Sequence, residues 1–346
     1  MRHVVLMAAA SAWLAASSAA EALDSVRLLK GGTVNGRVTK MSPTEVEVEG
    51  AGGLTKAVPV NEIDVVLWDD EPSQIKTARQ HLKEANFQSA MQTLEKISLP
   101  ANARPELKQD LEFYTAFTKA QMALAGQGEI REAGSQMAAF VKNNPGNYHW
   151  LHANEVVGDL LVAAGAFDRA VEYYATVGKA PWPDYKMRAG VAMGRALLAQ
   201  DKIAEAEKQF DAVLAIRAEG EMADAQRLAA RLGKARCLAA NKKTEEAIKD
   251  IESIIERANA EQTDLMAQAY TALGNAYSAA GKTKEAIFAF LHVDLLYYMN
   301  GDAHAEALAN LVVLWKKDNK PERAQRALQT LESRYRNSPW LKKATG

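Results

Sequence analysis

Cysteine is almost absent from this chain, because its 346 residues include only Cys237. No intramolecular disulfide can form, so packing alone must hold the folded chain together. We interpret Cys237 as a small apolar residue inside a helix, since unpaired cysteine is among the most buried residue types. A catalytic nucleophile is the less favoured interpretation of this thiol.

An excess of charge of either sign is also missing. The chain has 42 Lys and Arg residues against 43 Asp and Glu residues, which gives a formal net charge of −1. Bulk nucleic-acid binding and strong attraction to anionic membranes both need a basic excess, so we expect no nucleic-acid partner. Beyond residue 22 no stretch is apolar enough to predict a transmembrane segment.

The sequence lacks the common motifs of catalytic and cofactor sites. It contains no glycine-rich phosphate loop, His-Glu-x-x-His, Cys-x-x-Cys, EF-hand loop or Gly-x-Ser-x-Gly. We therefore expect no catalytic residues, no cofactor and no bound metal, which is to say a protein that is not an enzyme.

One segment, HWLHANE, leaves a metal-binding or enzymatic alternative open. His149, His152 and Glu155 follow one another at intervals of three residues, so consecutive members lie near one face of a helix. Two imidazoles and a carboxylate are typical zinc ligands. No fourth ligand is visible, however, and two successive intervals of three drift around the helix. We favour polar residues at a helix start.

The first residues, MRHVVLMAAASAWLAASSAAEA, have the outline of a secretory signal peptide. A short polar start, Arg2 and His3, precedes an apolar run over residues 4–16, and small residues near positions 18–22 fit a cleavage site. The run is short for a membrane span. We expect residues 1–22 to be removed and the protein to be exported, either periplasmic or secreted. An uncleaved anchor is the alternative.

Residues 23–70 predict a small all-β domain. Five short valine-rich segments are separated by turn residues: 25–29, 33–39, 45–50, 56–60 and 64–69. Five strands of this length match an SH3-like or Sm-like barrel, which we interpret as a peptide-binding or structural module. Pro72 bars a continuing strand, and Ser73 suits the start of the helical region predicted over 73–340.

From Ile75 onwards apolar residues recur at intervals of three and four, which predicts amphipathic helices. An alanine opens the second helix of each predicted unit, at steps of 36 to 43 residues: Ala90, Ala133, Ala170, Ala206, Ala247, Ala286 and Ala324. Seven such anchors at so regular a spacing indicate internal repeats rather than an irregular helical domain.

Two further positions repeat with the anchors. Twelve residues before the anchor a small residue is common, as at Gly158, Gly194 and Gly274. Four residues after it stands a large one: Leu94, Met137, Tyr174, Phe210, Ile251, Phe290 and Leu328. Two antiparallel helices approach closely only where one lacks a bulky side chain, and large side chains then fill the flanking grooves.

This spacing resembles the tetratricopeptide repeat (TPR). The segment YTALGNAYSAAGKTKEAIFAF, residues 270–290, is the best match, and residues 156–174 and 192–210 follow it closely. The resemblance covers about 270 residues and implies a mainly α protein, an α-solenoid of about seven stacked TPR-like hairpins. Gln121 and Val312 depart from the small-residue position, and Gly233 stands two residues early in the fifth unit.

The resemblance also implies that the first helices line a concave surface, which in TPR proteins usually binds a peptide or a partner helix. The inward-facing positions include His152, Glu155 and Asp159, then Arg188 and Arg195, then Arg236, and finally Asn275 and Ser278. Arginine grips carboxylates through two hydrogen bonds, so an acidic protein or peptide partner is expected. Alternatively, the arginines are solvated or paired with Glu205, Glu219 or Glu221.

These features together predict a non-enzymatic protein–protein interaction scaffold of a bacterial-type cell envelope. Its partner would lie in the concave groove of the helical repeats, with the β-domain as a second contact site. A structural envelope protein that self-assembles is the main alternative, with stacked units associating end to end as a homo-oligomer. A metal-binding or enzymatic protein that uses the His149, His152 and Glu155 cluster is the less favoured one.

Overall fold

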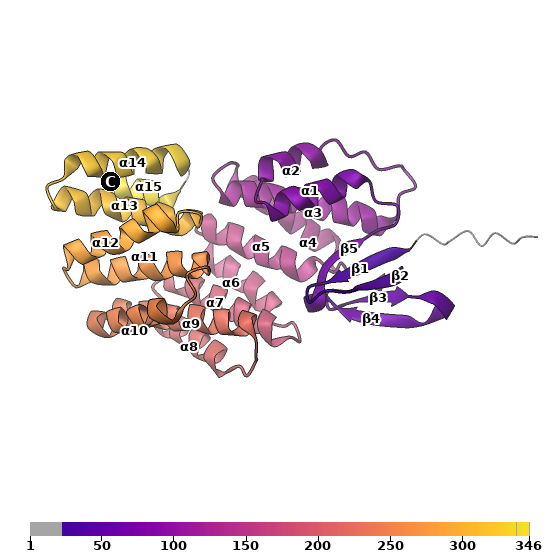
Figure 1. The fold of residues 1–346 in the computed structure, drawn as a ribbon, viewed down its shortest axis with the longest axis horizontal. Helices are drawn as coiled ribbons and strands as arrows, with labels where there is room; N and C mark the ends of the chain where they lie inside the picture. Colours follow the sequence, from indigo (N-terminus) through magenta and orange to yellow (C-terminus); the bar gives the residue numbers. More distant parts are fainter. Residues whose placement is uncertain (1–22, 337, 346) are drawn as a thin grey trace, which may run out of the picture.

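The computed structural model describes residues 23–336 and 338–345, and it is mainly helical (Figure 1). A small five-stranded sheet comes first and a stack of helical hairpins follows. The predicted signal peptide, residues 1–22, lies outside the described residues. Within the described part, no helix combines the length and the apolar character that crossing a membrane requires.

The five predicted strands form one antiparallel sheet in the order β4-β3-β2-β1-β5. Their bounds are Asp24–Leu28 (β1), Thr33–Met41 (β2), Glu45–Glu49 (β3), Thr55–Pro59 (β4) and Ile63–Leu67 (β5). Short 3-10 turns, Ala51–Gly53 and Val60–Glu62, lead into β4 and β5. The register shifts between Val38 and Lys40 on β2, and such a bulge bends the strand.

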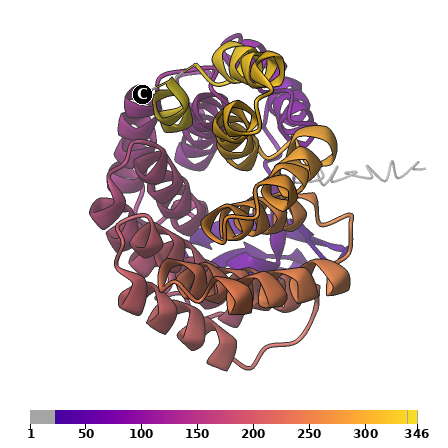
Figure 2. The same cartoon turned by 90° about the vertical axis from the view of Figure 1, so that its left-hand side faces the viewer.

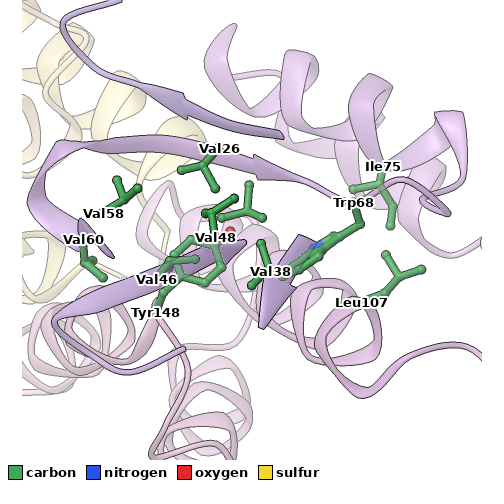
Figure 3. Packing of buried hydrophobic residues seen from close by; sticks show 11 residues of the cluster. Val26, Val38, Val46, Val48, Val58, Val60, Trp68, Ile75, Leu107 and Tyr148 are labelled. Atoms are coloured by element: carbon green, nitrogen blue, oxygen red, sulfur yellow. The ribbon is translucent and has the colours of Figure 1, made fainter. Parts of the chain in front are cut away.

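Alternate residues of the strands point to one side and form a valine core. Val26, Val38, Val46, Val48 and Val58 are buried in a single cluster that also contains Trp68 (Figure 3). Strands from both edges of the sheet contribute to this core, but the edge strands β4 and β5 do not pair with each other in the described chain, so the sheet does not close into the predicted barrel. The cluster extends across the predicted domain boundary to Ile75, Leu107 and Tyr148, which belong to the helical region.

Seven helical hairpins follow the sheet, which confirms the expected number. Their bounds are Ser73–Lys83 and Phe87–Leu94 (α1, α2), Pro105–Leu124 and Ile130–Asn143 (α3, α4), Trp150–Ala163 and Phe167–Val177 (α5, α6), Pro183–Leu198 and Ile203–Ala215 (α7, α8), Glu221–Ala240 and Thr244–Arg257 (α9, α10), Thr263–Ala279 and Thr283–Leu296 (α11, α12), and Gly301–Lys317 and Pro321–Arg334 (α13, α14). A short helix, Pro339–Thr345 (α15), packs against α13 and α14.

The seven anchor alanines occupy one structural position. Each is the fourth residue of the second helix of its hairpin, and each is buried. Five residues before the anchor, in six of the seven hairpins, the turn contains a residue with positive φ: Ala85, Gly165, Asp201, Lys242, Gly281 and Asn319. In the second hairpin this residue is Gly126, seven before Ala133, because its turn is two residues longer. The repeat therefore fixes the turn as well as the helix contact.

The glycine positions are close contacts between helices. A Cβ atom on Gly158, Gly194 or Gly274 would lie 2.4 to 2.7 Å from the ring of Tyr174, Phe210 or Phe290, respectively. The early glycine of the fifth unit has a different partner. A Cβ atom on Gly233 would clash with Cε1 and Cζ of the Phe210 ring, so this glycine serves the contact with the preceding unit. The expected position in its own hairpin is Ala235, which is fully buried.

Successive hairpins wind around a common axis, and Figure 2 shows the last helices coming back near the first ones. A Cβ on Gly126, in the turn between α3 and α4, would lie 3.3 Å from the carbonyl oxygen of Arg334 at the end of α14. The C-terminal end of the solenoid therefore contacts the second hairpin. The first helices of the hairpins, packed against one another from α7 through α13, form its concave surface.

Candidate functional site: the concave surface and the cavity at its sheet end

The predicted groove residues lie on α5, α7, α9 and α11, and the first of them form a charged row between α5 and α7. Arg188 Nε lies 2.7 Å from Glu155 Oε1 in an ion pair, and the Arg188 guanidinium stacks over the Tyr185 ring at 4.5 Å. Tyr174 donates a hydrogen bond of 2.7 Å to Asp159 Oδ1. Arg188 is therefore neutralised within the protein, by Glu155 rather than by Glu205, Glu219 or Glu221.

Helices surround Glu155 and Asp159, although solvent reaches both side chains from the concave side, where Glu155 is half-buried and Asp159 is exposed. Burial raises the pKa of Glu155 to about 7, and Arg188 offsets only part of that rise. Burial also raises the pKa of Asp159 above its ordinary value, against the opposing effect of the Tyr174 hydrogen bond. Glu155 is consequently a group on this surface that changes charge near neutral pH.

Arg195 and Arg236 extend the row to α9. Burial, and after it the nearby charge of Arg236, lower the pKa of Arg195 to about 10, so Arg195 stays charged at neutral pH. Arg236 donates a hydrogen bond of 3.3 Å from Nη2 to the carbonyl oxygen of Gln268. Arg195 has no ion pair or hydrogen bond with any residue that the structure describes. Arg195 and Arg236 therefore both lack an ion pair with a described residue, and the carboxylates of Asp159 and Asp264 act on Arg195 only from beyond ion-pair distance.

The predicted polar residues of α11 are farther along the solenoid. Asn275 donates a hydrogen bond of 2.7 Å from Nδ2 to Glu306 Oε1 on α13, and burial raises the pKa of Glu306. Ser278 lies three residues further along α11 and is exposed. Asn275 is thus partly committed to an internal contact, while Ser278 is accessible.

A cavity that the sequence did not predict lies where the sheet meets the solenoid. Its volume is about 750 Å³. Its walls come from β5, α1, α3, the segment before α5 and the start of α7, and they are rich in aromatic rings: Phe113, Tyr114, Phe117, Tyr148, His149, His152 and Tyr185. His152 belongs to both the cavity and the predicted groove row, so the cavity adjoins the concave surface. We call it the sheet-end cavity.

A buried polar network supports the inner wall of the sheet-end cavity. Asp110 is fully buried on α3, and its Oδ2 accepts hydrogen bonds from Trp68 Nε1 at 2.9 Å and from Arg79 Nη2 at 3.0 Å. Arg79 also donates two hydrogen bonds to Glu71, at 2.8 and 2.9 Å. Burial disfavours the charged guanidinium, but Tyr114, Asp110 and Glu71 together raise the pKa of Arg79 above its ordinary value. These bonds fix the sheet to α1 and α3.

The two histidines of HWLHANE both lie against Phe113 but have different environments. His149 is 8% exposed, stacks on Phe113 with ring centroids 3.7 Å apart, and places Nε2 3.2 Å from Asp110 Oδ1. His152 is exposed, and its ring centroid lies 5.1 Å from that of Phe117. Glu155 is held by Arg188.

Burial lowers the pKa of His149. The helices packed around His152 lower its pKa as well, although the residue is exposed, so both imidazoles are neutral at pH 7. Within residues 23–336 and 338–345, no three His, Cys, Asp or Glu side chains are grouped as metal ligands.

Cys237 is buried on α9, with its Sγ 3.9 Å from the carbonyl oxygen of Ile203. Burial raises the pKa of its thiol to about 11. A nucleophilic cysteine needs the thiolate form, which is scarce at neutral pH when the pKa is raised. The environment therefore favours the interpretation of Cys237 as a packing residue.

The sequence contains a group of aromatic residues that could have predicted the sheet-end cavity, but their positions also fit the core of a helical repeat. The segment EFYTAF, residues 112–117, places three rings on one stretch of α3, and Tyr148 and His149 precede α5. In a repeat protein such residues are readily interpreted as ordinary core. Only the packing of β5 and α1 over them shows that they line a cavity.

Comparison with known proteins defines the fold but not the function. No protein-family model and no curated protein matches the sequence. Among solved structures, a tetratricopeptide repeat protein from Parabacteroides merdae is similar, with a TM-score of 0.54 and 16% identity over 79% of this chain and 98% of the other.

A Rap protein in complex with competence and sporulation factor has a TM-score of 0.53 and 14% identity, over 78% of this chain and 76% of the other. At these identities the likeness concerns the fold, which is that of a TPR-type solenoid.

Proposed function

We propose that this protein is a non-enzymatic scaffold outside the cytoplasm, which binds an acidic segment of a protein or peptide partner along its concave surface. Helical repeats of this type offer a long curved surface for such segments. The similar Rap protein structure, a complex with competence and sporulation factor, supports a binding role for the fold.

The observation that carries the proposal is the unpaired charge of Arg195. A guanidinium surrounded by helices is stabilised by an opposite charge, and the two carboxylates that act on Arg195, Asp159 and Asp264, make no ion pair with it. Arg236 adds a second positive charge nearby, because its charge lowers the pKa of Arg195. A carboxylate of a bound partner would compensate both and would accept directed hydrogen bonds from the Arg195 fork.

A peptide-binding measurement tests the proposal. The probe is a fluorescein-labelled peptide of five Glu-Ala repeats, and a Lys-Ala peptide of the same length serves as the charge control. Arg195→Gln should weaken binding of the acidic peptide by about tenfold to a hundredfold, because charge-assisted hydrogen bonds contribute about 1.5–3 kcal/mol. Arg169→Gln is the matched variant, since Arg169 is exposed on α6, a second helix of its hairpin.

Two outcomes would count against the proposal. The first is equal affinity for the acidic and basic peptides, and the second is an equal loss in the Arg195 and Arg169 variants. A partner screen by cross-linking and mass spectrometry of envelope extract would then identify the natural partner or show that none is recovered reproducibly.

Export and self-association are separate proposals with separate tests. The mass of the protein purified from a culture, together with its N-terminal sequence, shows whether residues up to 20 or 22 have been removed. Light scattering over a concentration series tests end-to-end assembly, and a monodisperse monomer at all concentrations would exclude that alternative.

A further inference from the structure

We infer that the sheet-end cavity is a socket for one aromatic side chain, a tyrosine or a tryptophan, of the partner segment that binds along the concave surface. This inference rests on the proposed peptide binding and adds the position and the chemistry of its anchor. It involves β5 and α1 as well as the repeats, so the sheet becomes part of the binding site.

The cavity has ample room for such an occupant, and its walls suit an aromatic ring. Ligand sites in proteins are commonly concave, mostly apolar, and roughly 300–1,000 Å³ in volume, and this cavity measures about 750 Å³. Aliphatic residues of the sheet, including Val60, Ile63 and Val65, face rings from α3 and α5 across it. Aromatic rings pack edge-to-face or offset against other rings with an extra stabilisation of about 0.5–1.5 kcal/mol, which favours an aromatic over an aliphatic anchor.

A buried polar atom among the lining residues lacks a hydrogen bond. The Tyr148 hydroxyl is paired with the hydroxyl of Tyr114, but His81 Nδ1 is buried without a partner in the described chain. A buried polar atom without a partner costs about 1–3 kcal/mol. The hydroxyl of a tyrosine or the indole N–H of a tryptophan would supply the missing bond.

The charge of the cavity favours a neutral group over a charged one. His149 and His152 are neutral at pH 7, as their lowered pKa values show. Arg79 is already bound by Glu71 and Asp110, and Asp64 is shared by Arg27 at 2.7 Å and Lys83 at 3.2 Å. Lys76, the lining charge that makes no ion pair with a described residue, is exposed on α1. A charged side chain would therefore find no free counter-charge among the buried lining residues, whereas a neutral ring would not lose any ion pair.

The position of the cavity points to a peptide as the source of the ring. His152 and Tyr185 line the cavity, and Glu155 and Arg188 stand one turn further along the same two helices. A segment lying on the concave surface near Arg195 therefore needs only to continue past Arg188 to reach the cavity with one side chain.

The test compares three labelled peptides that differ at one position: the Glu-Ala peptide with its central alanine kept, replaced by leucine, or replaced by tryptophan. We expect the tryptophan peptide to bind at least tenfold more tightly than the alanine peptide, with leucine between them. Thr77→Phe on α1 fills the cavity from an exposed position and should abolish this preference while leaving the affinity for the alanine peptide unchanged. Gln74→Phe, exposed on the same helix but outside the cavity lining, should change neither.

The outcomes separate this inference from the proposed function. If no acidic peptide binds, peptide binding on the concave surface fails. If all three peptides bind equally, or if the preference for tryptophan survives in Thr77→Phe, the aromatic socket is wrong while peptide binding stands. If free N-acetyltryptophanamide displaces the tryptophan peptide with the same affinity as that peptide, the cavity is a small-molecule site and the peptide anchor is overturned.

Discussion

Replacing Gly274 by alanine tests the packing on which the repeat depends. Gly274 lies within α11, and a Cβ built on it would be 2.7 Å from Cε1 and Cζ and 2.8 Å from Cε2 of Phe290 on α12. Phe290 is fully buried, so its ring has no open space into which it can turn. The methyl group must therefore push α11 and α12 apart.

Two opposing terms set the size of the effect. Alanine is favoured over glycine inside a helix by about 1 kcal/mol. Overpacking of a close core contact costs about 1–3 kcal/mol, and it belongs at the upper end here because three ring atoms are contacted at once. We expect Gly274→Ala to lower the free energy of unfolding by about 1–2 kcal/mol, with a larger loss for Gly274→Leu.

Urea unfolding followed by circular dichroism measures this change, and the chain supplies its own control. Gly134 is also inside a helix, α4, but the nearest heavy atom to its hypothetical Cβ is Leu160 Cβ at 3.9 Å. Gly134→Ala should therefore stabilise the protein by about 0.5–1 kcal/mol. If Gly274→Ala stabilises the protein as Gly134→Ala does, the close contact with Phe290 is refuted. Adding Phe290→Leu should restore part of the loss, as expected for coupled neighbours.

Three further predictions follow from the turns, the groove and the thiol. Lys242→Gly should stabilise the protein by about 0.5–1 kcal/mol, because Lys242 has a φ of 63° that glycine adopts without strain; Lys249→Gly, inside α10, should instead destabilise it, and equal effects would contradict the turn geometry. Glu155 has a pKa of about 7 when folded and near 4.5 when unfolded, so its contribution to stability is greatest below pH 4.5 and is lost as the pH rises to 7. The stability of the wild-type protein relative to Glu155→Gln should thus fall by about 2–3 kcal/mol from pH 5 to pH 8, and a pH-independent difference would contradict the raised pKa. Cys237 should react with a thiol reagent at pH 8 at least a hundredfold more slowly in the native protein than in urea, and equal rates would show that the thiol is accessible.

The sequence was sufficient for the fold because the fold is repetitive. Each anchor alanine could be checked against six others, so an irregular unit such as the fifth did not disturb the register. The strands were equally recognisable, because valine-rich segments separated by Gly31–Gly32 or Ser42–Pro43 leave few alternatives. The expectation of a small residue twelve positions before each anchor did not explain Gly233, because it considered contacts within a hairpin and not those between neighbouring hairpins.

The candidate site was less predictable, because it depends on pairing between distant residues. The register placed Arg188 on the concave side, but only the structure shows that Glu155 neutralises it. The same holds for the sheet-end cavity, whose polar support joins Trp68 and Arg79 to Asp110, 42 and 31 residues away. Helical periodicity reports which side of a helix is apolar, and it carries no information about which residues meet across elements.

The position of the sheet now has a physical explanation. Asp24 is buried at the start of β1, where it accepts two hydrogen bonds from Arg104, at 2.8 and 3.0 Å, and one from the backbone N–H of Val38 at 2.9 Å. Together with the bonds to Asp110, these contacts make the sheet a continuation of the first two hairpins. Because the sheet is attached through these contacts, its shape and its residues can differ from those of the repeats without disturbing the stacking of the hairpins. The arginine row and the cavity are therefore separable: one depends on the repeat register, and the other depends on the sheet that closes its end.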